Sequence, residues 1–206
     1  MIDNQSVFIK FNTLKEIIIF SFLRLIIQTP NKPRGRRFMN YSKIKKYDIS
    51  NGCGIRTSIF FTGCNFHCPG CFNPELWDKN SGKIFDNAVK SELFSYLADE
   101  HCDGLSVLGG EPLIQGIQLV ELLEEVREKF PKKTIWLWTG YKISGELDET
   151  QKMIISLCDY VVDGLFKEEF AGKKLRFRGS SNQIIWKNVN GEFVEAEEVE
   201  NNSRFK

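Results

Sequence analysis

Residues 58–71, SIFFTGCNFHCPGC, join a short apolar run to a loop that carries three closely spaced cysteines. The β-branched and aromatic residues at 58–62, followed by a glycine, predict a buried β-strand. Cys64, Cys68 and Cys71 come next in a CxxxCxxC pattern. Because ligands bind at the ends of strands in parallel sheets, three thiolates on this loop indicate a metal centre at the edge of a sheet.

The nature of that centre follows from the number of ligands. A closed zinc site needs four ligands, and His67 lies between two of the cysteines, where the loop would struggle to turn its ring inward. Cys53, Cys102 and Cys158 stand alone in the sequence. Three thiolates suit a [4Fe–4S] cluster that leaves one iron open to a ligand. A zinc ribbon, or cysteines without a metal, are the alternatives.

The composition describes one globular domain in a reducing compartment. The chain has 206 residues, of which 42% are hydrophobic. Its net charge is +1, but residues 1–38 hold seven Lys/Arg against two Asp/Glu, which leaves −4 for the remainder. A mildly acidic body lacks the basic face of a nucleic-acid-binding protein. Since three of the six cysteines crowd into eight residues, a metal site is favoured over disulfides, and we expect a cytoplasmic protein.

The two ends of the chain differ from the body. The apolar run at 17–23 is shorter than the roughly 20 residues of a membrane span, and no small-x-small cleavage site follows it. Residues 33–37 can be encoded by purine-rich codons just before Met39, as in a translated ribosome-binding site. We therefore expect residues 1–38 to be a non-native extension, a membrane anchor being the alternative. Residues 190–206 contain five Glu and predict an acidic, disordered tail.

Strands and helices alternate in the domain that remains, residues 39–189. Apolar, β-prone runs predict strands at 58–62, 105–108, 134–138 and 160–162. Apolar residues at helical spacing predict helices at 86–100, 117–130 and 148–157. Asp86 is the expected N-cap of the first helix, and the second should bury Leu119, Leu122, Leu123 and Val126. This alternation indicates an α/β domain with a mainly parallel sheet.

A second motif, Gly109-Gly110-Glu111-Pro112, follows the second predicted strand. Glycines at this position let a ligand approach the backbone and leave carbonyls that can accept hydrogen bonds from an ammonium group. Glu111 adds a charge-assisted acceptor. A GGEP sequence alone is more often a simple turn. Here it follows CxxxCxxC by one strand–helix unit, and this position indicates a ligand site.

CxxxCxxC followed by GGEP resembles the radical S-adenosylmethionine superfamily. Within it, the chain is most similar to the activating proteins of anaerobic ribonucleoside-triphosphate reductase, through residues 51–78, GLSVLGGEPL at 104–113, IWLWTGY at 135–141, VVDGLF at 161–166 and RGSSNQ at 178–183. The similarity covers essentially residues 39–186, and WTGY and RGSSNQ narrow it to this family. Cys53, where relatives often have Pro, and the acidic tail depart from the pattern.

The resemblance implies a single-domain, incomplete (β/α) barrel of the radical S-adenosylmethionine type. A [4Fe–4S] cluster would be held by Cys64, Cys68 and Cys71. S-adenosylmethionine would be bound by the open iron and by Gly70, Cys71, Phe72, Gly109, Gly110 and Glu111. Its reductive cleavage would release a 5′-deoxyadenosyl radical, which takes hydrogen from a glycine of the large reductase subunit. Expected partners are that subunit and a flavodoxin- or ferredoxin-type electron donor, with no nucleic acid and no membrane.

Two kinds of rival function stay open. Another compact radical enzyme, such as a pyruvate formate-lyase activase or a deazaguanine-forming cyclase, is disfavoured by WTGY and RGSSNQ. A non-enzymatic iron–sulfur carrier or zinc adaptor is disfavoured by GGEP, because neither needs a site for an aminoacyl ligand. Two segments have no assigned role. RGSSNQ could cap a turn or contact a ligand or partner, and the basic run at 173–178 is either a solvated face or a docking surface.

Overall fold

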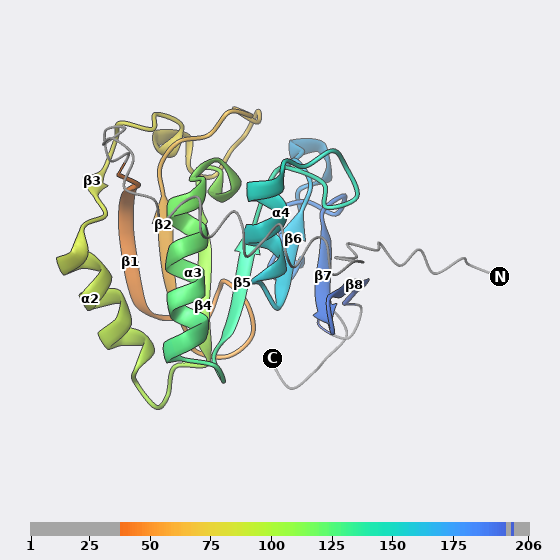
Figure 1. Cartoon of the computed structure of the whole chain (residues 1–206). Helices are drawn as coiled ribbons and strands as arrows, with labels where there is room; N and C mark the ends of the chain where they lie inside the picture. The colour runs from red at the N-terminus through yellow and green to blue at the C-terminus, as the bar shows by residue number, and fades with distance from the viewer. Residues whose placement is uncertain (1–37, 197–198, 200–206) are drawn as a thin grey trace.

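One eight-stranded sheet organises residues 38–196 and 199, which are the residues described by this computed structural model (Figure 1). The strand order is β3-β1-β2-β4-β5-β6-β7-β8. The strands are β1 (Asn40–Asp48), β2 (Arg56–Phe61), β3 (Lys83–Ile84), β4 (Gly104–Gly109), β5 (Thr134–Trp138), β6 (Tyr160–Asp163), β7 (Ile184–Val189) and β8 (Glu192–Glu195). The predicted extension lies outside the described residues except for Phe38.

Among the described residues, three α-helices pack on this sheet, namely α2 (Asn87–Leu97), α3 (Ile117–Lys129) and α4 (Glu149–Ser156). Short 3-10 helices occur at Pro74–Leu76, Pro112–Ile114 and Glu168–Phe170. The three predicted helices and four predicted strands are confirmed, with boundaries that differ by at most three residues. No helix in the described part of the chain is long and apolar enough to cross a membrane.

The centre of the sheet is parallel, whereas both margins are antiparallel. Strands β2, β4, β5 and β6 form three parallel pairings, and β1, β3, β7 and β8 add four antiparallel ones. The prediction of a mainly parallel sheet was therefore wrong, and the fold is a mixed α/β single sheet. The sequence pattern predicts the strands that alternate with helices. It does not reveal β1, which is rich in lysine, or the β7–β8 hairpin, whose tight turn at Asn190 and Gly191 permits only antiparallel pairing.

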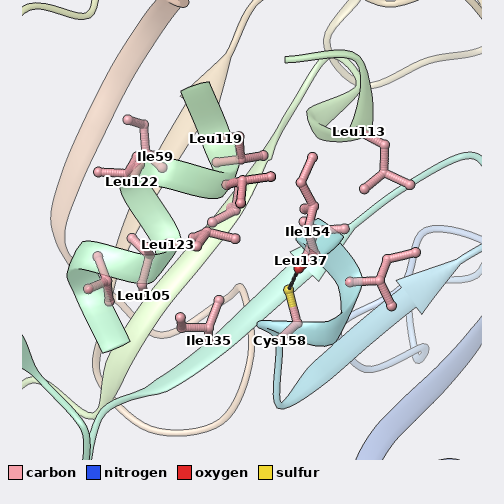
Figure 2. Packing of buried hydrophobic residues seen from close by; sticks show 14 of the residues in the cluster. Ile59, Leu105, Leu113, Leu119, Leu122, Leu123, Ile135, Leu137, Ile154 and Cys158 are labelled. Atoms are coloured by element: carbon pink, nitrogen blue, oxygen red, sulfur yellow. Dashed lines mark hydrogen bonds between the residues drawn. The ribbon is translucent and has the colours of Figure 1, made fainter. Parts of the chain in front are cut away.

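One face of the sheet forms the core under the helices and the other lines a cavity, because successive residues of a strand point to opposite sides. Ile59, Val107, Leu137 and Val161 stand in register across the parallel strands and are fully buried on the helix-covered face. Figure 2 shows Leu119, Leu122 and Leu123 of α3 packed close to strand residues of this face. The residues next in sequence, Phe60, Leu108 and Trp138, face the other side and line a cavity.

Local signals at the helix termini act as the sequence predicts. The Asp86 side chain accepts a hydrogen bond from the Val89 N–H at 2.9 Å and caps α2. A capping box of Asp148 and Gln151 starts α4. The inward residues expected for α3 are all buried, so its apolar stripe faces the sheet. Just after the end of α4, the Cys158 thiol donates a hydrogen bond to the Ile154 carbonyl at 3.2 Å (Figure 2).

The sheet extends beyond the domain boundary expected at residue 189. Strand β8 pairs with β7, and its Phe193 is only 1% exposed and belongs to the core. The prediction of a disordered tail from residue 190 was thus wrong for this strand. Its alternation of Glu192, Phe193, Val194 and Glu195 is that of a half-buried strand, which the glutamate content concealed. Residues 197–198 and 200–206 of the predicted tail lie outside the described residues.

Replacing Phe193 by alanine tests whether β8 closes the core. We expect Phe193→Ala to lower the free energy of unfolding by about 3–5 kcal/mol, the usual loss when a buried phenylalanine is truncated. Val194→Ala, on the opposite and partly exposed side of the strand, is the matched control and should cost about 1 kcal/mol or less. Urea denaturation followed by circular dichroism measures both, and equally small losses would contradict a structural role for β8.

Candidate metal and cofactor site

A cavity of about 440 Å³ lies on the side of the sheet away from the helices, and the loops that follow the parallel strands contribute to its lining. Its lining includes seven of the eight predicted site residues, namely Cys64, Cys68, Cys71, Phe72, Gly109, Gly110 and Glu111. The two motifs are some 40 residues apart in sequence and meet here because the carboxyl ends of β2 and β4 share one edge of the sheet. The eighth, Gly70, does not line it.

Backbone hydrogen bonds fix the start and the end of the cysteine loop. The N–H groups of Gly63 and Cys64 donate to the carbonyls of Leu76 and Trp77, at 2.8 and 3.0 Å. At the other end, the Asn73 N–H donates to Cys71 Sγ at 3.4 Å. The His67 ring packs against Trp77, with centroids 4.8 Å apart, and does not line the cavity.

The three thiols are close enough to influence one another. Burial raises the pKa of the Cys68 thiol, and the charges of Cys64 and Cys71 raise it further. A metal cation would relieve this repulsion between thiolates. Within the described residues, no three His, Cys, Asp or Glu side chains converge as ligands of a single ion. A four-iron cluster instead distributes its thiolate ligands over separate irons, and three soft ligands on the wall of a cavity fit this group.

Glu111 joins the loop after β4 to the loop after β5. Its carboxylate is 1% exposed and accepts hydrogen bonds from the Leu113 N–H at 2.9 Å, the Thr139 hydroxyl at 2.8 Å and the Gly140 N–H at 2.8 Å. Burial raises the pKa of Glu111 to about 7, against the effect of these three donors. Both carboxylate oxygens are therefore already engaged by the protein. The predicted contact of Glu111 with a cofactor ammonium group would have to use the lone pairs that remain.

Close backbone packing explains the glycines of the two motifs. A Cβ on Gly109 would lie 2.2 Å from the Phe61 carbonyl oxygen, and one on Gly110 would lie 2.2 Å from that of Gly63. Gly70 has a φ of +69°, and a Cβ there would meet the Glu168 carboxyl group at 2.8 Å. These contacts require glycine without any ligand. Cofactor binding by Gly70, Gly109 and Gly110 stays a prediction.

Aromatic side chains form part of the wall. Phe72 is 71% exposed, and its ring lies 5.0 Å from that of Phe166, which also lines the cavity. Trp138 lines the cavity too, and its indole N–H donates to the Phe177 carbonyl at 2.6 Å. Several lining residues were not assigned to the site from sequence: Ser50, Asn51, Asn73, Trp77, Thr139, Gly140, Phe166, Phe177, Arg178, Gly179 and Gln183. Many of these residues belong to the motifs WTGY, VVDGLF and RGSSNQ, which were the sequence signal that could have assigned them to the site.

The WTGY motif packs directly on the cysteine loop. The Tyr141 hydroxyl accepts a hydrogen bond from the Asn65 side chain at 2.8 Å, and the rings of Tyr141 and Phe66 meet edge to face at 4.7 Å. A Cβ on Gly140 would lie 2.6 Å from the Phe66 ring. Cys102 and Cys158, by contrast, are buried in the helix-covered core. Neither of them, nor Cys53, lines the cavity.

Comparison with known proteins agrees with this geometry. Residues 50–186 match the model of the 4Fe-4S single cluster domain family. The chain is 38% identical over 155 residues to the anaerobic ribonucleoside-triphosphate reductase-activating protein of Enterobacteria phage T4, an alignment that covers 74% of this chain and 97% of the relative. The chain belongs to this family of activating proteins. The resemblance drawn from CxxxCxxC, GGEP, WTGY and RGSSNQ is thereby confirmed.

Other activating proteins match over the same part of the chain. That of Escherichia coli K12 is 38% identical over 151 residues, with 71% of this chain and 97% of the relative covered. That of Haemophilus influenzae is 37% identical over the same length and coverage. The matched domain model describes a single 4Fe-4S cluster and so supports an iron–sulfur group for this chain.

The raised pKa of Glu111 makes a prediction about stability. The folded protein holds the proton up to about pH 7, whereas the unfolded chain releases it near 4.5, so the free energy of unfolding falls as the pH rises between these values. Glu111→Gln cannot ionise and lacks this contribution. We expect the stability of wild type relative to Glu111→Gln to fall by up to about 3 kcal/mol between pH 4.5 and 8.

Urea denaturation at a series of pH values measures this difference. Glu128→Gln, which changes an exposed carboxylate of α3, is the control and should follow the wild type at every pH. A constant difference between wild type and Glu111→Gln would show that the carboxylate is ionised in the folded protein throughout this range.

Proposed function

We propose that the chain binds a [4Fe–4S] cluster and S-adenosylmethionine, cleaves the latter reductively, and generates a glycyl radical on anaerobic ribonucleoside-triphosphate reductase. One observation carries the proposal. The three thiols of CxxxCxxC and the GGEP loop line a single cavity, in a chain 38% identical to a named activating protein over 97% of that protein. The reductase is inferred as the target from the name of these relatives. The cofactors are inferred from the thiols and the GGEP loop that line the cavity.

Cys64, Cys68 and Cys71 would hold the cluster, and the GGEP loop would bind the aminoacyl end of S-adenosylmethionine. When bound, the cluster would supply the electron that breaks the sulfonium S–C bond. The protein would orient the cluster and S-adenosylmethionine relative to each other and exclude water from them. Phe60, Leu108 and Trp138 form an apolar cavity wall that keeps water from the reacting groups.

The nucleoside has a suitable surface beside the cysteines. The paired rings of Phe72 and Phe166 present aromatic faces next to Cys68 and Cys71, and purines stack readily on such rings. Gly179 lies behind this pair and leaves room for both rings. We assign the adenine end of the ligand to this pair and the aminoacyl end to Gly109, Gly110 and Glu111.

The edge of the sheet that bears the cavity also suits a protein partner. Four exposed apolar side chains belong to loops at the carboxyl ends of β2, β4 and β6, namely Phe72, Ile114, Leu165 and Phe170. Residues 167–178 add five basic side chains against two acidic ones. The sheet is open between β3 and β8, in keeping with an incomplete barrel of the radical S-adenosylmethionine type, whose open side could admit a glycine-bearing segment.

The first test concerns the cluster. Anaerobic reconstitution should load about four irons per chain. Cys64→Ala, Cys68→Ala and Cys71→Ala should each abolish loading, because each removes one of only three ligands. Cys102→Ala and Cys158→Ala are the controls and should load as the wild type does, since these thiols lie in the opposite core. Iron and sulfide analysis measures the content, and stoichiometric zinc without iron would refute the proposal.

The second test concerns the radical. With a reduced cluster and S-adenosylmethionine, the chain should generate a glycyl radical on the large reductase subunit, and no glycyl radical should form when that subunit is absent. If that subunit carries glycine deuterated at Cα, the label should appear in the released 5′-deoxyadenosine, because the hydrogen is abstracted directly. Electron spin resonance and mass spectrometry give the two readouts. Cleavage without a glycyl signal or label transfer would point to a small-molecule radical enzyme instead.

A further inference from the structure

Two lysines of β1 lie at one border of the cavity. Ile44 packs against the helix-covered core, so its neighbours Lys43 and Lys45 point to the opposite face of the sheet, the face that lines the cavity. Both lysines are exposed, and their ammonium groups lie over the ring of Phe60, at 4.6 and 5.5 Å from its centre. Phe60 is only 5% exposed and lines the cavity. The two positive charges therefore stand directly beside the cavity wall.

The charges of these two lysines are poorly balanced by their neighbours. Within the described residues, Lys43 makes no ion pair, and Lys45 makes one long pair with Asp48, at 4.0 Å. The Asp48 carboxylate already accepts hydrogen bonds from the Ser50 N–H and the Asn51 side chain, at 3.0 and 2.6 Å. The face of the shared ring attracts both ammonium groups and offsets part of their repulsion. Two positive charges are thereby gathered within a Debye length of about 10 Å.

A second basic group comes from the other side of the parallel strands. Residues 173–178, KKLRFR, hold four basic side chains and no acidic one, and Leu175, Phe177 and Arg178 line the cavity. This segment follows β6, whereas β1 pairs with β2, so the two groups come from opposite margins of the parallel centre of the sheet. Among the residues that line the cavity, Glu111 is the only Asp or Glu, and it is buried. Lys43, Lys45 and residues 173–178 are called the basic border below.

The sign of the basic border is opposite to that of the body of the protein. Residues 39–206 carry a net charge of −4, so the positive groups beside the cavity do not simply reflect composition. Like charges gathered beside a cavity repel one another, and they also raise the local concentration of anionic groups. In the proposed function the cavity receives a glycine of another protein. A segment of that protein therefore has to pass the basic border.

We propose that the basic border docks an acidic segment of the large reductase subunit, adjoining the target glycine, and that Lys43 and Lys45 face its carboxylates. This inference rests on the proposed function, which supplies the glycine-bearing partner. Charges at the rim of an interface act mainly on the rate of association and on orientation. Because both lysines lie over Phe60, they orient the docked segment relative to the cavity wall.

Three double variants separate charge from packing. Lys43→Gln/Lys45→Gln removes both charges and keeps most of each aliphatic stem over Phe60. Lys43→Arg/Lys45→Arg keeps both charges. Lys129→Gln/Lys132→Gln is the matched control, because it removes two exposed lysine charges at the end of α3 and in the turn after it, neither of which lines the cavity.

The experiment uses the full chain, reconstituted with iron and sulfide, reduced with dithionite and supplied with S-adenosylmethionine. Surface plasmon resonance without oxygen measures its association with the large subunit. We expect Lys43→Gln/Lys45→Gln to lower the association rate constant about tenfold at about 0.1 M salt. The difference should vanish at about 1 M salt, where the Debye length falls to about 3 Å. The arginine variant and the control should associate as the wild type does.

The outcomes separate this inference from the proposed function. Wild-type protein that forms no glycyl radical on the subunit would overturn both. If the radical forms but the glutamine variant associates as fast as wild type, only the inference fails. Equal losses in the glutamine and arginine variants would attribute the effect to packing on Phe60 and would also overturn it. Unchanged association, with slower cluster reduction by an acidic electron-carrier protein, would reassign the basic border to the electron donor.

Discussion

The carboxylate of Glu111 connects the two loops that form the centre of the cavity. It is buried, and three donors from residues 113, 139 and 140 surround it. A buried carboxyl group is costly unless its hydrogen bonds are made, so these loops are held together by the need to satisfy it. Without this bond network, GGEP and WTGY would be two independent turns. The cavity takes its shape from their connection.

From Glu111 the contacts continue to every motif that marks the family. Gly140 bonds Glu111, and the adjoining Tyr141 contacts Asn65 and Phe66 of the cysteine loop. On the far side of the cysteines, the Phe166 ring packs on the Phe72 ring, and RGSSNQ side chains bond the backbone on both sides of Phe166. Motifs spread over some 130 residues thus form one connected set around the three thiols. These contacts hold the cysteine loop in a fixed position against the loops that follow β4, β5 and β6.

Much of this could be predicted from the sequence, because the relevant signals are local. Apolar periodicity located α2, α3, α4 and the four parallel strands, and cysteine spacing located the loop whose three thiols line the cavity. The outer strands of the sheet were not predicted, because their alternation of apolar and polar residues is weak. Strand β1 alternates lysines with half-buried residues, and β8 carries one buried phenylalanine among glutamates. Spacing also shows which residues are neighbours but not which way they face. Gly70 does not line the cavity, and its contact with a cofactor stays a prediction.

The sequence by itself determined the family, the position of the cysteine loop and the strands at the parallel centre of the sheet, since each is signalled by residues within a few positions of one another. Only the tertiary structure decided what Glu111, the glycines and RGSSNQ do. Glu111 binds groups 28 and 29 residues away, Gly110 packs against a carbonyl of the preceding loop, and Gln183 reaches back 19 residues to Gly164. Such partners are set by strand register and loop path, and these exist only once the sheet has formed.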